Sequence, residues 1–179
     1  MRIALVGFMG SGKSQVGRVL GASLAVPFYD LDREIETSEG LSIPEIFTRR
    51  GEPYFRPLES AALRRFASMG GDFVLATGGG VVLDAGNREI LKTQYRAIWL
   101  DVPASILDAR MRLDRGGRPL LLTDDDTERK NRIESMLSAR AAWYESVASI
   151  RYRWSESDDS VQASAQAILE ALRHDSALI

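Results

Sequence analysis

The sequence predicts an α/β fold in which helices cover both faces of a parallel sheet. Short apolar runs alternate along the chain with longer segments whose apolar residues recur every three or four positions. The runs are apolar at every position, which is typical of strands buried on both faces. The chain has 179 residues, a length that predicts one domain. We therefore expect a single three-layer α/β/α domain over residues 1–179.

The first part of the chain contains two of the expected strands. The apolar run that starts at Ile3 ends at Gly7. Ser42 and Glu45 have the spacing of a capping box, and Pro44 lies early in the same helix. The expected elements are a strand over 3–6, a helix over 13–24, a strand over 27–30, a helix over 31–38, a helix beginning after residue 42 and a helix over 59–69.

The rest of the chain continues this alternation. Gly70 and Gly71 end the preceding helix, and three further glycines end the next strand. Parallel strands joined by helices form right-handed crossovers, so the helices belong to the layers beside the sheet. The expected elements are a strand over 73–76, a helix over 84–92, a strand over 97–100, helices over 103–113 and 127–147, a strand over 148–152 and a helix over 161–172.

Composition and charge exclude several classes of function. The chain has no cysteine, which excludes disulfides, thiolate zinc sites and cysteine nucleophiles. The single histidine, His174, lies near the C-terminus in a polar tail, which argues against a Ser-His-Asp hydrolase and a multi-histidine metal site. The net charge of −2 argues against a nucleic-acid-binding protein, and no apolar run approaches the roughly 18 residues of a membrane span. We expect a cytoplasmic protein without a membrane or nucleic-acid partner.

The strongest motif lies between the first strand and the first helix. Residues 7–14 match the pattern G-x-x-x-x-G-K-[ST], which ends in Lys13 and Ser14. The N–H groups of such a loop bind phosphate oxygens, the lysine reaches the β- and γ-phosphates, and the hydroxyl is a ligand for Mg²⁺. The alternative is a glycine-rich turn, but the four fixed positions rarely coincide by chance in this context. The motif predicts an ATP site.

Asp30 and Asp32 follow the second expected strand. Ligands of open α/β sheets bind beyond the carboxyl ends of the strands, so these acids suit a magnesium ion and a substrate hydroxyl. No aspartate directly follows the third strand, which makes Asp30 the candidate acid for magnesium. The alternative is that both acids cap the next helix, because aspartate is favoured in a first turn.

Three arginines are candidates for binding anionic groups. Arg56 lies three residues before Glu59, which can hold its guanidinium group for a substrate carboxylate. Arg118 lies in a polar stretch with two glycines, where a loop arginine can close over phosphates. Arg140 is a second candidate ligand for a carboxylate. For each of the three, an exposed surface arginine is the alternative.

Three successive glycines, Gly78, Gly79 and Gly80, follow the third expected strand. Glycines at this position allow the backbone to approach a ligand closely and to offer its N–H donors. A loose turn is the alternative interpretation.

Together these motifs resemble the shikimate kinase family. The resemblance extends from residue 1 to about 150 and implies a nucleoside-monophosphate-kinase-like fold, with five parallel strands in the order 2-3-1-4-5 and a mobile lid over about 112–126. It also implies transfer of the γ-phosphoryl group of ATP to the 3-hydroxyl of shikimate, in chorismate and aromatic amino-acid biosynthesis. The matching motifs are residues 7–14, Asp30-x-Asp32, Phe55-Arg56-x-x-Glu59, Gly78-Gly79-Gly80, Arg118-Pro119-Leu120-Leu121 and Arg140-x-x-x-Tyr144.

The resemblance further implies roles for individual residues. The residues expected at ATP are Gly10, Ser11, Gly12, Lys13, Ser14, Gln15, Arg110 and Arg118, with Mg²⁺ held by Ser14 and, through water, by Asp30. The residues expected at shikimate are Asp32, Arg56, Gly78, Gly79, Gly80 and Arg140, around a substrate-binding region at about 31–63. The residues expected to be catalytic are Lys13, Asp32 and Arg118, with Asp32 contacting the ring hydroxyls and accepting a proton.

The chain departs from the family pattern at three places. Gln15 replaces a hydroxyl residue, residues 141–143 replace an apolar-proline-leucine run, and residues 151–160 lack the proline of an adenine-contacting loop. We therefore assign no adenine-binding residue within 151–160.

Two other functions stay open at this point. A kinase for gluconate or for a nucleotide would use the same phosphate loop, although Phe55-Arg56 and the three glycines fit shikimate better. A kinase-like binding domain without catalysis is expected to lack Lys13, Asp32 or Arg118, and the chain has all three. The chain has no long heptad pattern, so we expect a monomer.

Overall fold

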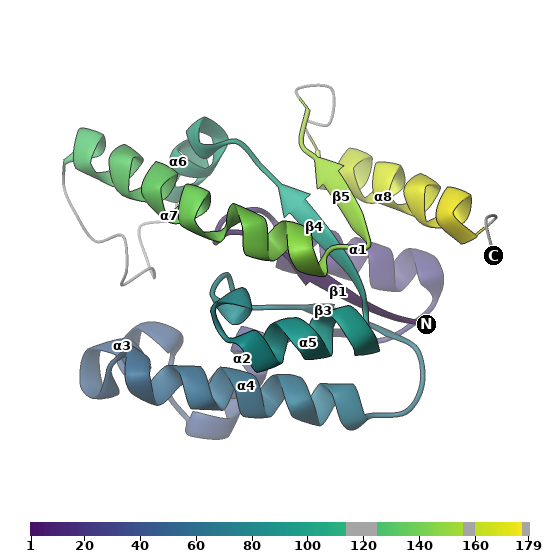
Figure 1. Ribbon diagram of the computed structural model, residues 1–179, viewed down its shortest axis with the longest axis horizontal. Helices are drawn as coiled ribbons and strands as arrows, with labels where there is room; N and C mark the ends of the chain where they lie inside the picture. Colours follow the sequence, from purple (N-terminus) through teal and green to yellow (C-terminus); the bar gives the residue numbers. More distant parts are fainter. Residues whose placement is uncertain (114–124, 156–159, 177–179) are drawn as a thin grey trace.

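A computed structural model describes residues 1–113, 125–155 and 160–176, and within them a five-stranded parallel sheet forms the centre of the molecule (Figure 1). The strands lie in the order β2-β3-β1-β4-β5, and each neighbouring pair is parallel. Both the α/β fold and the strand order implied by the resemblance are therefore confirmed. The strands are β1 (Arg2–Val6), β2 (Phe28–Asp30), β3 (Phe73–Ala76), β4 (Arg96–Asp101) and β5 (Ile150–Arg153).

Helices cover both faces of this sheet. Figure 1 shows α4, α5 and α7 on one side and α1 and α8 on the other, with α6 beyond the carboxyl end of β4. The described helices are α1 (Lys13–Leu24), α2 (Leu31–Glu39), α3 (Ile43–Arg50), α4 (Glu52–Ser68), the 3₁₀ helix η1 (Val81–Leu83), α5 (Ala85–Gln94), α6 (Ala104–Leu113), α7 (Asp126–Val147) and α8 (Val161–Ser176).

The two faces of the central strand explain why its run is apolar throughout. Ala4 and Val6 belong to the core beneath α4, α5 and α7. Ile3 and Leu5 belong to the core beneath α1 and α8. Successive side chains of a strand point to opposite faces, so a strand between two helix layers needs an apolar residue at every position. The sheet and its two helix layers thus give the loops at the carboxyl ends of the strands a rigid base.

The main difference from the expected elements is the start of α4. This helix begins at Glu52 rather than at residue 59, and η1 was not expected. Two prolines obscure the helix in the sequence. Pro53 lies in the first turn, where its missing N–H costs no helical hydrogen bond, and the helix continues through Pro57. Arg56 therefore lies within a helix, one turn after its start.

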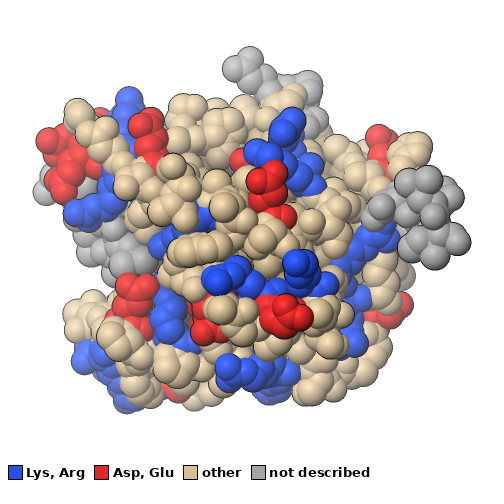
Figure 2. Space-filling view, in the orientation of Figure 1, with Lys and Arg blue, Asp and Glu red and all other residues tan. Residues whose placement is uncertain are grey.

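Charges of both signs are mixed on the surface. Figure 2 shows Lys and Arg side chains interspersed with Asp and Glu over the face that carries α4, α5 and α7. Within the described residues, no helix combines the length and the apolar character of a membrane span. The expected lid over about 112–126 falls largely outside the described residues, and Arg118 falls outside them entirely.

Candidate active site

A cavity of about 1270 Å³ lies where β1, β2 and β3 end. This is the edge of a parallel sheet at which ligands bind. Every expected nucleotide residue except Arg118, which lies outside the described residues, and most of the expected shikimate residues share this one cavity. The expected residues that line it are Gly10, Ser11, Gly12, Lys13, Ser14, Gln15, Asp32, Arg56, Gly78, Gly79, Gly80 and Arg110.

The phosphate loop, residues 7–14, owes its shape to left-handed backbone. Gly10 and Gly12 have φ angles of 80° and 93°, which residues other than glycine rarely adopt. Gly12 is the N-cap of α1, and no described side chain caps this helix end. The first N–H groups of α1 are therefore available to an anion, and the helix dipole favours a negative charge at the same point.

Lys13 is buried inside this loop. Its Nζ donates hydrogen bonds to the carbonyl oxygens of Gly7 and Phe8, both at 2.9 Å. The residue is only 8% exposed. The loop thus holds an ammonium group beside backbone N–H donors, which is the arrangement that binds a polyphosphate.

The two acids after β2 have different surroundings. Asp30 is the N-cap of α2, since its Oδ1 accepts hydrogen bonds from the backbone N–H groups of Asp32 at 3.2 Å and Arg33 at 3.5 Å. The capping interpretation is therefore correct for Asp30, which is not among the residues that line the cavity. Asp32 does line the cavity. Burial raises the pKa of Asp32 to about 6, and Asp30 adds to the increase while Lys13 opposes it.

Arg56 is held by two glutamates of its own helix. Its Nη1 donates to Glu59 at 2.7 Å, and its Nε and Nη2 donate to Glu52 at 2.9 and 2.6 Å. Glu59 is 1% exposed, so the interpretation as a solvated surface pair is wrong. Burial raises the pKa of Glu59 to about 7, against the opposing effect of Arg56. The guanidinium group is thereby fixed at the cavity wall.

The glycine loop, residues 78–80, packs directly against these charged groups. A Cβ atom on Gly78 would lie 2.3 Å from Oε1 of Glu59 and 3.0 Å from Oδ1 of Asp32. A Cβ atom on Gly80 would lie 2.2 Å from Nη1 of Arg56. None of the three glycines has a positive φ angle. Lack of space, and not backbone conformation, therefore requires glycine here, and the loose-turn interpretation is wrong.

Gly79, in the middle of the glycine loop, connects the phosphate loop to α7. A Cβ atom on Gly79 would lie 2.8 Å from the backbone nitrogen of Met9. The Gly79 carbonyl oxygen accepts hydrogen bonds from the Tyr144 hydroxyl at 2.5 Å and from Nη1 of Arg140 at 3.3 Å. Burial raises the pKa of Tyr144 to about 12, so its hydroxyl keeps the proton that it donates. One helix and two loops thus meet at Gly79.

Arg140 lies at this junction and not on the surface. It is 6% exposed, and its guanidinium carbon lies 5.6 Å from the ring centre of Phe8. The interpretation as a surface helix arginine is therefore wrong. Arg140 is nevertheless not among the residues that line the cavity. A role in binding shikimate stays a prediction for this residue.

The nucleotide side of the cavity includes residues that the sequence did not single out. Nη1 of Arg110 donates to the Gly10 carbonyl oxygen at 3.2 Å, so this expected residue does contact the phosphate loop. Tyr152 and Trp154, from β5 and the residue that follows it, line the cavity together with Arg110. Their positions depend on contacts between distant parts of the chain, so no local pattern could have found them. Glu52 was also missed, although its spacing of four residues from Arg56 was a usable signal.

The fold and this cavity define a P-loop kinase that acts on a small molecule. At the end of a parallel sheet, one cavity contains both the phosphate loop with its lysine and the fixed guanidinium group of Arg56. The loop can bind a nucleotide, and the arginine can bind an anionic acceptor. A sequence profile of the shikimate kinase family matches residues 9–173. The chain belongs to the shikimate kinase family. Members of this family transfer phosphate from ATP to a hydroxyl of shikimate, so the expected activity is confirmed at this level.

Individual relatives agree with this assignment. A shikimate kinase of Salinibacter ruber is 45% identical over 81% of this chain and 73% of its own length. The structure of shikimate kinase from Acinetobacter baumannii in complex with shikimate superposes with a TM-score of 0.89, at 35% identity over 97% of this chain and 93% of that one. A gluconokinase from Sinorhizobium meliloti has a TM-score of 0.54 at 17% identity, over 99% and 95% of the two chains. This last likeness shows a shared fold only.

Proposed function

We propose that the cavity transfers the γ-phosphoryl group of ATP to the 3-hydroxyl of shikimate. The observation that carries this proposal is the position of Arg56, which is fixed by Glu52 and Glu59 in the same cavity as the phosphate loop. A planar guanidinium group is the preferred bidentate partner of a carboxylate, and shikimate has one carboxylate. The acceptor is thereby oriented by its acid group, with its ring towards the phosphates.

Arg140 is the second proposed carboxylate ligand. Its Nη1 donates to the carbonyl oxygen of Gly79, a residue that lines the cavity, so Arg140 lies next to the acceptor side. Gly78, Gly79 and Gly80 complete the wall around the ring, because a loop without side chains allows close approach. Residues of α2 to α4 form the proposed substrate-binding region at about 31–63, and the glycine loop packs against its Asp32, Arg56 and Glu59.

Asp32 is the proposed partner of the ring hydroxyls and the acceptor of the proton from the attacking one. With a pKa of about 6, its carboxyl group is ionised at neutral pH and can accept a hydrogen bond from a hydroxyl. Phosphoryl transfer proceeds through a loose transition state, so positioning and charge contribute more to the rate than a strong base. Asp32 therefore acts first by orienting the hydroxyl.

The nucleotide side supplies positive charge. Lys13 would exchange its carbonyl partners for the β- and γ-phosphates, and the N–H groups of Gly10, Ser11, Gly12, Ser14 and Gln15 would surround the same oxygens. Arg110 would lie beside the nucleotide. Arg118, outside the described residues, is proposed as the lid arginine that closes over the phosphates, on the strength of the family resemblance.

The residues present fit a magnesium ion. Ser14 offers a hydroxyl oxygen in the cavity, and Asp30, which caps α2 and does not line the cavity, would act through a bound water. Hard oxygen donors suit this ion, and Mg²⁺ usually keeps several waters and phosphate ligands. The bound ion would neutralise charge on the phosphates.

A coupled assay of ADP release tests the function. We expect release with shikimate and ATP that is far faster than with quinate, gluconate or nucleoside monophosphates. Failure to release ADP with shikimate would overturn the proposal, and release with another acceptor would identify the alternative kinase. A monomer in the cytoplasm is the proposed state, and sedimentation of the purified chain tests the oligomeric part of it.

A further inference from the structure

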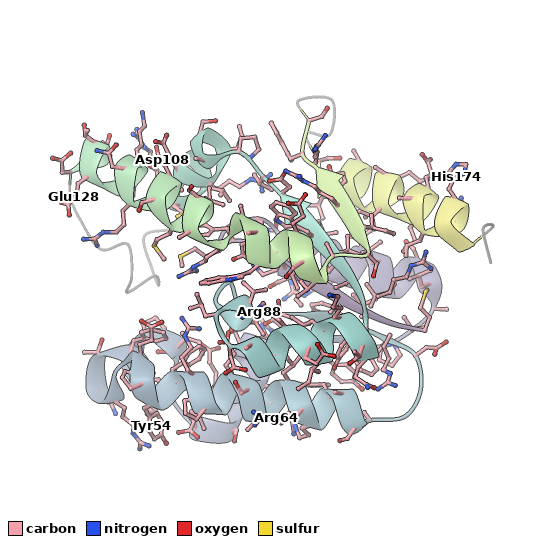
Figure 3. All side chains as sticks on the ribbon, viewed as in Figure 1. Tyr54, Arg64, Arg88, Asp108, Glu128 and His174 are labelled. Atoms are coloured by element: carbon pink, nitrogen blue, oxygen red, sulfur yellow. The ribbon has the colours of Figure 1, made fainter. Side chains whose placement is uncertain are left out.

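A buried ion network joins α6 to α7 outside the cavity. Asp108 of α6 is 3% exposed, and its two carboxylate oxygens have different partners. Oδ1 accepts from Nε of Arg129 on α7 at 2.7 Å, and Oδ2 accepts from Nε of Arg112 at 3.2 Å. Figure 3 labels Asp108 where the two helices lie side by side. A carboxylate this buried needs such partners, because an unpaired buried charge is strongly destabilising.

Asp126, at the start of α7, extends the pair to a network of four charges. Nη2 of Arg112 lies 2.8 Å from Oδ2 of Asp126, and Nη2 of Arg129 lies 2.5 Å from Oδ1 of Asp126. Each arginine thus bridges the two aspartates. The Asp108–Arg129 half is the buried one, since the side chain of Arg129 is 12% exposed and that of Asp126 is 58% exposed.

The same short helix also carries a residue of the nucleotide side. Arg110 lies midway between Asp108 and Arg112 in the chain. Residues two positions apart in an α-helix are separated by about 200° around its axis. Asp108 and Arg112 share the face towards α7, as their spacing of four residues requires. Arg110 therefore points to the opposite side, where its Nη1 meets the Gly10 carbonyl at 3.2 Å and the side chain lines the cavity.

This geometry couples the network to the cavity. Apolar packing of Leu107 and Met111 against Ile133 holds α6 near α7, but apolar contacts have little directional preference. The hydrogen bonds to Asp108 are directional, so they fix the rotation of α6 about its axis. A rotation of α6 would move Arg110 away from the phosphate loop.

We propose that Asp108 is a positioning residue for the nucleotide: its ion pair with Arg129 sets the rotation of α6 and thereby holds Arg110 against the phosphate loop. The inference rests on the proposed function in one respect, namely that Arg110 lies beside the nucleotide. It assigns no chemical step to Asp108. It predicts that nucleotide binding and shikimate binding respond differently to a change at the α6–α7 junction.

The first test is Asp108→Asn, which keeps the shape of the side chain and removes its charge. We expect the affinity for ADP, measured by titration calorimetry without shikimate, to fall about tenfold. The KM for ATP should rise by a similar factor, while the KM for shikimate changes less than about twofold. If Asp108→Glu binds ADP as the unchanged protein does, this would support the proposal that the negative charge at position 108 positions α6.

Arg129→Gln provides a second variant in case Asp108→Asn does not fold. It should weaken ADP binding in the same way, and the double variant should be no weaker than the worse single variant, because both changes break one interaction. The matched control is Arg132→Gln, which removes the more exposed pair with Glu128 at 3.1 Å on the same helix. We expect this control to bind ADP as the unchanged protein does.

Two results would overturn the inference. One is a folded Asp108→Asn or Arg129→Gln protein that binds ADP with unchanged affinity, even if its thermal midpoint falls, because the network would then only stabilise the fold. The other is an equal loss of ADP and shikimate affinity. Failure of the proposed function would be seen separately, as absence of shikimate-dependent ADP release by the unchanged protein.

Discussion

The two sides of the cavity use glycine for different physical reasons. In the phosphate loop, Gly10 and Gly12 adopt positive φ angles, so the backbone itself forms the binding surface. In the glycine loop, Gly78 and Gly80 have ordinary backbone angles and leave room for Glu59 and Arg56. The nucleotide side is therefore shaped by the backbone, whereas the acceptor side is shaped by paired charges packed against the backbone. Substitutions on the nucleotide side should therefore affect nucleotide binding and phosphoryl transfer, and substitutions on the acceptor side should affect shikimate binding.

Lys13→Ala is the strongest test of the nucleotide side. We expect kcat to fall about a thousandfold, because the charge on the transferring phosphoryl group loses its lysine partner. The affinity for shikimate, measured directly by calorimetry, should change little, since Arg56 and Asp32 are untouched. Lys92→Ala, on the exposed side of α5, is the matched control and should retain full activity. A folded Lys13→Ala protein with normal turnover would contradict the assignment.

Asp32→Asn tests the charge on the acceptor side. We expect kcat/KM for shikimate to fall about a hundredfold at pH 8. Burial raises the pKa of Asp32 to about 6, so the carboxylate is ionised above that pH and becomes neutral below it. In the unchanged enzyme kcat/KM should therefore decrease below about pH 6, by roughly tenfold for each pH unit. A pH–rate profile of the variant that kept this decrease would show that another group causes it.

Gly12→Ala and Gly80→Ala form a pair that tests the comparison directly. An alanine at position 12 is strained at a φ of 93°, so we expect ADP affinity to fall about tenfold while shikimate affinity is kept. An alanine at position 80 would displace the guanidinium of Arg56, so we expect the opposite selectivity at a similar magnitude. Calorimetry with each ligand alone measures both effects. If either variant lost affinity for ADP and for shikimate equally, the two sides of the cavity would not be separately shaped as proposed.

Glu52→Gln should have the smallest effect. The Glu52 side chain is 40% exposed, and Glu59 still holds Arg56 after the change. We expect the KM for shikimate to rise two- to threefold, as against about tenfold for Glu59→Gln. Steady-state kinetics at saturating ATP measures the difference. If the two variants had equal KM values, burial of Glu59 would not be what fixes the arginine.

Local patterns predicted much of this molecule. The phosphate loop was identified by its spacing and by the strand and helix beside it, which involve only neighbouring residues. Ser42 and Glu45 form the capping box that their spacing predicted. The start of α4 was missed because Pro53 interrupts the local helical signal. With that start misplaced, Glu52 was not recognised as the second partner of Arg56.

Other features depend on contacts between distant residues. Gly79 receives its hydrogen bonds from α7, more than sixty residues away in the chain. The Asp108–Arg129 pair joins two helices across 21 residues. Such pairs are selected by the packing of helices on the sheet, and no local spacing reveals them. The resemblance predicted that Arg140 belongs to the site, but not that it lies behind Gly79 rather than in the cavity wall.

The crowding around residues 78–80 has a consequence for inhibition and resistance. A compound that hydrogen-bonds to the backbone of this loop would contact a surface that carries no side chain to alter. A substitution that introduced even a methyl group would collide with Glu59, with the backbone of Met9 or with Arg56. A resistance mutation at these positions would therefore disturb the substrate site itself. Resistance by point mutation in this loop should therefore carry a loss of fitness.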